Sequence, residues 1–77
     1  MNEKQILVDR LRNELPPIFT RKIAAKHLGG VIARGTLANL DSKGIGPGGV
    51  KGGKHRIYER DSFLAWFEGW LSREDGR

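Results

Sequence analysis

The chain has 77 residues, a formal net charge of +5 at pH 7 and no cysteine. This length accommodates one small domain, because a second hydrophobic core would need more residues than remain. Without cysteine there is neither a disulfide framework nor a thiolate ligand for zinc, which is typical of proteins that fold in a reducing cytoplasm. The polar start and the short apolar runs predict neither a signal peptide nor a membrane span.

The positive charge is concentrated in the middle of the chain. Residues 20–58 carry eight Lys and Arg against a single Asp, whereas residues 1–19 are balanced and residues 59–77 carry more acidic than basic side chains. A basic segment that also contains helix and turn signals predicts a folded basic surface instead of a charged tail. Such a surface favours a polyanionic partner.

The first element in chain order is an amphipathic helix over residues 2–15, which must stop at Pro16-Pro17. Its predicted inner face consists of Ile6, Leu7, Leu11 and Leu15. A second, two-turn helix opens at Phe19-Thr20, with Thr20 as its N-cap, and ends at Gly29-Gly30.

A third helix is predicted over about residues 34–43, with Leu37 and Leu40 facing inward and Gly44 at its carboxyl end. Two short helices joined by a glycine-containing turn are typical of the helix-turn-helix plan.

A β-hairpin is predicted after the third helix, in a segment rich in glycine. Its tip is expected at Lys51-Gly52-Gly53-Lys54, followed by a strand over residues 54–58. The last helix, over about residues 60–72, has a broad apolar stripe. That stripe consists of Phe63, Trp66, Phe67, Trp70 and Leu71. We expect the first helix to pack over it through Leu7, Leu11 and Leu15, since an apolar face needs a mate.

These features occur in an order that resembles a known family. The segments that carry the resemblance are Thr20-Arg-Lys-Ile-Ala-Ala-Lys-His-Leu-Gly, Arg34-Gly-Thr-Leu-Ala-Asn-Leu, Lys43-Gly-Ile-Gly-Pro, Lys54-His-Arg-Ile-Tyr and Arg60-Asp-Ser-Phe-Leu. Together they resemble the small winged-helix DNA-binding domains of the excisionase and AlpA type, related to the MerR DNA-binding domain. The resemblance implies a mainly α fold with a small β-hairpin, a winged helix-turn-helix. It would consist of an N-terminal helical extension (1–17), the DNA-binding domain (18–72) and a C-terminal tail (73–77).

The resemblance also implies a function, namely sequence-specific binding of duplex DNA by an excisionase-like factor or an AlpA-type transcription regulator of bacterial or phage origin. It implies a recognition helix whose candidate residues are Arg34, Thr36, Ala38, Asn39 and Lys43, and a wing whose candidates are Lys51, Lys54 and Arg56. No cofactor and no metal are expected. The implied partners are duplex DNA, a second copy or a cooperative multimer on DNA, and a recombinase, in the nucleoid of a bacterial cytoplasm and away from membranes.

The residue types themselves favour the same interface. Arg34 can bond guanine and Asn39 can bond adenine in the major groove. Thr20, Arg21 and Lys22 open a helix at the end that attracts phosphate. For each of these residues the alternative is a solvated helix face.

Catalysis is not expected. Gly48, Gly53 and Lys54 have the spacing of a phosphate-binding loop, but His55 stands where the magnesium-binding Ser or Thr belongs. His27 and His55 have no neighbours in the sequence that would complete a metal site.

Two other functions remain open at this point. A protein-protein adaptor would use the same scaffold and dock through Trp66, Trp70 and the first helix, but it would not need the basic segment. An RNA-binding module ranks last, because the aromatic residues cluster in the last helix and not on a basic sheet.

Overall fold

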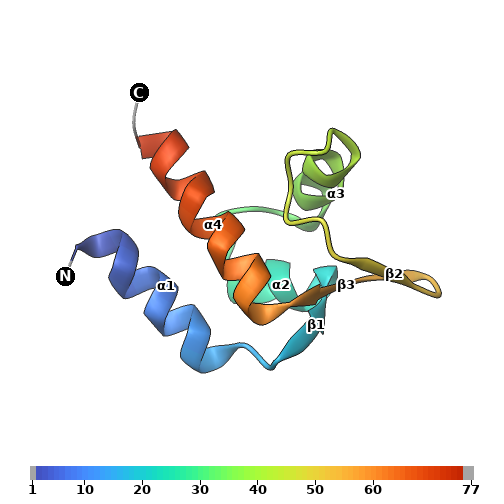
Figure 1. Cartoon of the computed structure of the whole chain (residues 1–77), viewed down its shortest axis with the longest axis horizontal. Helices are drawn as coiled ribbons and strands as arrows, with labels where there is room; N and C mark the ends of the chain where they lie inside the picture. Colours follow the sequence, from blue (N-terminus) through green and yellow to red (C-terminus); the bar gives the residue numbers. More distant parts are fainter. Residues whose placement is uncertain (1, 76–77) are drawn as a thin grey trace.

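The computed structural model describes residues 2–75 (Figure 1). The elements are α1 (Glu3–Glu14), β1 (Ile18–Thr20), α2 (Arg21–His27), α3 (Arg34–Ser42), β2 (Val50–Gly52), β3 (His55–Glu59) and α4 (Arg60–Asp75). Helices predominate, and the three short strands form an antiparallel sheet in the order β1-β3-β2. The prediction of a mainly helical domain with a small β-hairpin is confirmed at this level.

Helix α1 forms where the sequence predicts it and ends before Pro16. Asn2 caps its first turn, because the side-chain oxygen accepts a hydrogen bond from the Gln5 backbone N–H. Its inner face differs from the prediction. The buried residues are Val8, Leu11 and Leu15, whereas Ile6 and Leu7 are about half exposed. The prediction is confirmed for Leu11 and Leu15 and wrong for Ile6 and Leu7, because the same sequence also permits a stripe that runs through Val8.

Helix α4 is the centre of the core, and α1 packs against it (Figure 1). Phe63 and Phe67 are buried as predicted, and Leu64, which the predicted stripe omitted, is fully buried as well. Trp66 and Trp70 are partly buried at the edge of the same cluster. The expectation that the first helix covers the aromatic helix is therefore confirmed, with Val8 in place of Leu7.

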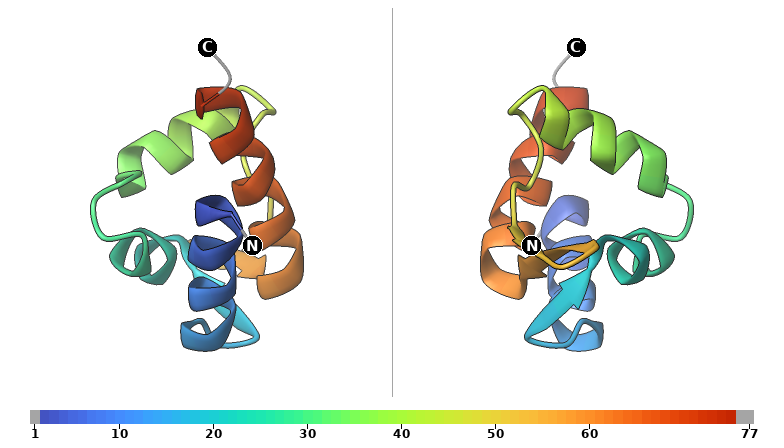
Figure 2. Two further views of the ribbon diagram at one scale, coloured as in Figure 1. Left: turned by 90° about the vertical axis from the view of Figure 1, so that its left-hand side faces the viewer. Right: turned by 90° about the vertical axis from the view of Figure 1, so that its right-hand side faces the viewer.

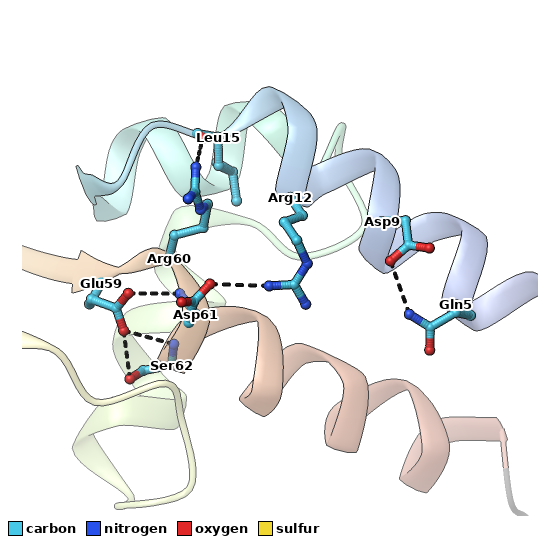
Figure 3. Close-up of polar contacts among 8 residues, drawn as sticks. All are labelled: Gln5, Asp9, Arg12, Leu15, Glu59, Arg60, Asp61 and Ser62. Carbon is cyan, nitrogen blue, oxygen red and sulfur yellow. Dashed lines mark hydrogen bonds and ion pairs between the residues drawn. The ribbon is translucent and has the colours of Figure 1, made fainter.

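Polar contacts join the end of α1 to the start of α4 (Figure 3). The Arg12 guanidinium pairs with the Asp61 carboxylate at 3.1 Å, and Arg60 donates a hydrogen bond to the Leu15 carbonyl oxygen. The Glu59 carboxylate accepts from the backbone N–H groups of Asp61 and Ser62, which starts the helix and lowers the pKa of Glu59.

Strand β1 was not predicted as a strand, although Phe19 and Thr20 were singled out. It is paired with β3, with Phe19 opposite Tyr58 and Thr20 opposite Ile57. Three residues are too few for an alternating pattern to be recognised in a sequence. Thr20 also keeps its predicted role, since its Oγ1 accepts a hydrogen bond from the Ile23 backbone N–H that caps α2.

Helices α2 and α3 follow each other through a short turn that contains Gly29 and Gly30, both with positive φ. Helix α3 ends at Ser42, and Gly44, the predicted terminating glycine, follows the C-cap residue Lys43 with a positive φ. The Gly44 N–H donates to the Asp41 carbonyl and the Ile45 N–H donates to the Leu40 carbonyl. This pair of bonds is the Schellman ending that a left-handed glycine permits.

The hairpin of β2 and β3 turns at Gly53-Lys54, within the predicted tip. It projects from one end of the long axis of the molecule, while α1 lies at the other end (Figure 1). The right-hand view of Figure 2 looks onto the side that carries the hairpin, α2 and α3.

The last helix runs past its predicted end at Ser72 to Asp75. Residues 73–75 therefore belong to α4 and not to the predicted tail, because Arg and Glu favour continuation of a helix and the sequence has no helix breaker before Gly76. The remainder of that tail, 76–77, lies outside the described residues.

Candidate nucleic-acid interface

A basic cleft of about 270 Å³ lies between the starts of α2 and α3 and the tip of the hairpin. It gathers side chains from three segments that are far apart in the sequence. The lining residues are Thr20, Arg21, Lys22, Arg34, Lys54, His55 and Arg56. Six of them are predicted DNA-binding residues, and no acidic residue is among the seven. Such a hollow presents several hydrogen-bond donors to one anionic group.

The sheet register brings these segments together. Thr20 at the end of β1 pairs with Ile57 on β3, so the start of α2 lies next to Arg56. On the other side of β3, Lys51 pairs directly with Arg56 across the hairpin. Like charges directly opposite each other in an antiparallel pair repel. An anion bound between or beside them would relieve that repulsion.

A part-buried ion pair joins the cleft to the rest of the domain through Arg21, which also lines the cleft. The Arg21 Nη2 lies 2.7 Å from the Asp41 Oδ2, and the Tyr58 hydroxyl donates to the same carboxylate oxygen at 2.7 Å. Arg21 also donates through Nε to the Tyr58 oxygen at 3.0 Å. The Asp41 side chain is only 4% exposed, and that of Arg21 is 23% exposed. Three elements, α2, α3 and β3, thus meet at one polar cluster.

The pKa values in this cluster reflect its geometry. Burial alone would raise the pKa of Asp41, but hydrogen bonds from Tyr58, Arg21 and the Gly48 backbone N–H outweigh it, so that pKa is lowered. Burial likewise opposes the charge on Arg21, yet its bonds to Asp41 and Tyr58 raise the Arg21 pKa. Burial and the bond to Asp41 raise the pKa of Tyr58 to about 12. At neutral pH both the carboxylate and the guanidinium are therefore charged, and the phenol is protonated.

This pairing determines how much positive charge faces outward. Asp41 is the only acidic residue between residues 20 and 58, and it is withdrawn from the surface and neutralised by Arg21. Each of the other seven cations of the segment has no acidic residue next to it in the sequence that would reduce its positive potential. They are Lys22, Lys26, Arg34, Lys43, Lys51, Lys54 and Arg56. Arg21 itself is tied to Asp41, so the structure gives this predicted DNA-binding residue a supporting contact within the protein.

The loop between α3 and the hairpin is anchored at two points. The Gly48 N–H donates to the Asp41 Oδ1 at 2.8 Å, and the Trp66 indole N–H donates to the Ile45 carbonyl at 2.8 Å. Gly49 has a φ of +76°, and a Cβ there would meet the Ile57 carbonyl and the Tyr58 ring. Only glycine fits without strain at this point. The base of the hairpin is therefore held against α3 and α4.

Helix α3 presents the remaining predicted residues. Leu37 is fully buried and fixes the inner face, while Arg34, Thr36, Asn39 and Lys43 are exposed. Thr36, Asn39 and Lys43 are spaced by three and four residues, so they form one stripe on the outer side. Arg34 instead belongs to the cleft, and Ala38 is half-buried. The predicted recognition set is thus divided between two surfaces.

The sequence pattern does not indicate the contacts of Asp41 and Tyr58 or the place of His55 in the cleft. One feature of the sequence does point to Asp41. A single acidic residue among eight cations is expected to form an ion pair with one of them. The residues that meet here are 17 to 37 positions apart, a separation that local patterns do not report.

The described residues offer neither a metal site nor a membrane-spanning helix. Residues 2–75 contain no group of three or more His, Cys, Asp or Glu side chains suited to a metal ion. Within the same residues no helix is long and apolar enough to cross a bilayer. Comparison with protein-family models, curated proteins and solved structures gave no match to this chain. The candidate interface therefore rests on its own chemistry.

Proposed function

We propose that this protein binds duplex DNA as a winged helix-turn-helix domain. Helices α2 and α3 would form the helix-turn-helix, and the hairpin of β2 and β3 would be the wing. The observation that carries the proposal is the basic cleft, in which cations from three separate segments converge and which no acidic residue lines.

The cleft is suited to a backbone phosphate. Phosphate contacts fix the orientation of a protein on DNA, and they are made by Arg, Lys, hydroxyl groups and backbone N–H groups. Arg34, Lys54 and Arg56 approach such a group from α3 and from the wing together. We therefore assign Arg34 to the DNA backbone, in place of the base contact that its residue type alone favours.

Helix α3 is suited to the major groove. Its outer stripe carries Asn39 between Thr36 and Lys43, and all three side chains are exposed. Asn can bond the N6 and N7 atoms of adenine together, which reads sequence directly. Asn39 is therefore the residue that we assign to base recognition.

This activity is common to the excisionase-like and the AlpA-type roles. An excisionase-like factor would present the bound DNA to a recombinase, and a regulator would occupy an operator. Both need the same contacts to duplex DNA, and the proposal covers that shared step.

The adaptor alternative has less support. Trp66 is partly buried, and its indole N–H is already bonded to the Ile45 carbonyl. Trp70 stacks on Phe67 with ring centroids 5.9 Å apart. These aromatic side chains are used in the packing of α4, which leaves less of them for a partner protein.

An NMR titration tests the proposal residue by residue. A random-sequence duplex of about 20 base pairs is added to ¹⁵N-labelled protein at low salt, where non-specific binding is strongest. We expect the amide signals of residues 20–22, 34–43 and 50–56 to shift, and those of residues 4–14 to stay. Shifts confined to α1 and α4, or none, would contradict DNA binding by this surface.

A further inference from the structure

Helix α1 exposes two large apolar side chains, Ile6 and Leu7, outside its buried face. Leu7 lies at the edge of the core, where it lines a hollow with Leu28 and Phe67. Ile6 is 48% exposed and Leu7 is 52% exposed, while Val8 and Leu11 are buried beneath them. The left-hand view of Figure 2 shows α1 in front of the other helices, with nothing over it. Contiguous exposed apolar surface is a feature of protein interaction sites.

Charged side chains of opposite sign flank this apolar pair. Glu3 lies about one turn before it and Arg10 about one turn after it, on the same outer face of the helix. Both are exposed, and within residues 2–75 the structure gives neither side chain a hydrogen bond or an ion pair. Along the helix this face therefore carries an acidic residue first, then the apolar pair and then a basic residue.

We propose that this face binds the same face of a second copy of the chain, with the two α1 helices antiparallel. A two-fold axis between Ile6 and Leu7 brings the four apolar side chains together at the centre. The same axis places Glu3 of each copy opposite Arg10 of the other, because both lie equally far from the axis along the helix. A single register of the two helices thus buries the apolar side chains and pairs the charged side chains.

Charge argues for a second copy as the occupant. Residues 1–19 have no net charge, whereas residues 20–58 have a strong positive excess. Two copies of this protein repel each other through the basic surface, and α1 is the element at which they can meet without that repulsion. A pattern that is complementary to itself after a two-fold rotation is what an isologous dimer interface requires.

The location of α1 is compatible with DNA binding by both copies. It lies at the opposite end of the molecule from the hairpin, so the dimer leaves both basic clefts open (Figure 1). One helix face is a small contact, and we expect the dimer to form in a concentration-dependent way. The dimer does not depend on the proposed function, since it is measured without DNA.

Sedimentation equilibrium of the full chain, from about 5 to 500 µM, tests this proposal with charge-reversal variants. We expect a reversible dimer for the parent. Glu3→Arg or Arg10→Glu should each weaken dimerisation by about tenfold or more, because two like-charge contacts replace two ion pairs. The double variant E3R/R10E should return to within about threefold of the parent, since it restores the pairs with their signs exchanged.

A matched control is Glu68→Arg, which makes the same change in charge as Glu3→Arg on an exposed position of α4. It should leave the dimer unchanged. Circular dichroism of each variant shows that it is folded. A parent that stays monomeric at the highest concentration overturns the proposal. A dimer that ignores both single reversals, or a double variant that fails to recover, places the contact elsewhere and overturns it as well.

Discussion

The Arg21 guanidinium lies 2.7 Å from the Asp41 carboxylate and joins the start of α2 to the end of α3, the two helices that we assign to DNA. The Tyr58 hydroxyl adds β3 to the same contact. The orientation of α3 relative to the hairpin is therefore set by one largely buried polar cluster. This cluster also pairs the only acidic residue of residues 20–58 with one of the eight cations of that segment.

Replacement of Asp41 by Asn should destabilise the fold. Asp41→Asn leaves the part-buried Arg21 guanidinium without its charged partner, and we expect the free energy of unfolding to fall by about 2–4 kcal/mol. Urea unfolding of the two proteins measures this difference. Asp61→Asn is the matched control, because it breaks the exposed pair with Arg12 and should cost less than about 1 kcal/mol. Equal losses for the two variants would contradict a structural role for the Asp41 cluster.

Stability should fall at high pH because of Tyr58. Its pKa is about 12 in the folded protein and 10 in an unfolded chain. Since the folded pKa is the higher one, the contribution of the protonated phenol is complete below pH 10 and is lost as the pH rises from 10 to 12. We expect the parent to lose roughly 1–3 kcal/mol more than Tyr58→Phe over that range. Urea unfolding of both proteins at a series of pH values measures this difference. If the pKa of Tyr58 were not raised by folding, the free energies of unfolding of the two proteins would change in parallel with pH.

Two leucines on one helix should respond differently to the same change. Leu11 is buried against α4, and Leu11→Ala should lower the free energy of unfolding by about 2–5 kcal/mol. Leu7 is half exposed, and Leu7→Ala should cost less than about 1 kcal/mol. Thermal melts at low protein concentration, below dimer formation, make the comparison. A larger loss for Leu7 would mean that the inner face of α1 is the one the sequence pattern predicted.

Base recognition and phosphate binding should separate in two variants. Asn39→Ala should lose about 1–3 kcal/mol on a selected target site and little on random duplexes. Lys54→Ala should weaken selected and random duplexes alike and reduce the salt slope by about one. Arg73→Ala, which removes a cation from α4 outside the cleft, serves as the control. If Asn39→Ala bound both kinds of duplex as the parent does, α3 would not read bases through that residue.

The sequence predicts helices well where local rules decide them. Pro16 and Gly44 end α1 and α3, and Thr20 caps α2, because each acts within a few residues of itself. The inner face of α1 could not be fixed in that way, since the choice between Leu7 and Val8 depends on where α4 lies. Tertiary contact, and not local preference, decides such cases.

The candidate site likewise combines features that local sequence patterns predict with features that only tertiary contacts decide. The residue types that line the cleft were recognisable as donors to an anion, and six of the eleven predicted residues meet there. Their convergence depends on the pairing of Thr20 with Ile57 in a strand of three residues. No local sequence pattern predicts that pairing. The separation of Arg34 from Asn39 likewise requires the position of α3 against the hairpin.

Fluorescence anisotropy with a labelled random duplex of about 20 base pairs, titrated from about 50 to 200 mM salt, tests DNA binding most directly. A protein that contacts 6–10 phosphates should lose about 10³–10⁵ in affinity over that range, because each contact releases condensed counterions. We predict a steep, linear decrease of log affinity with log salt for this protein. Absence of binding at the lowest salt concentration would contradict the proposal that the basic cleft and α3 form a DNA-binding surface.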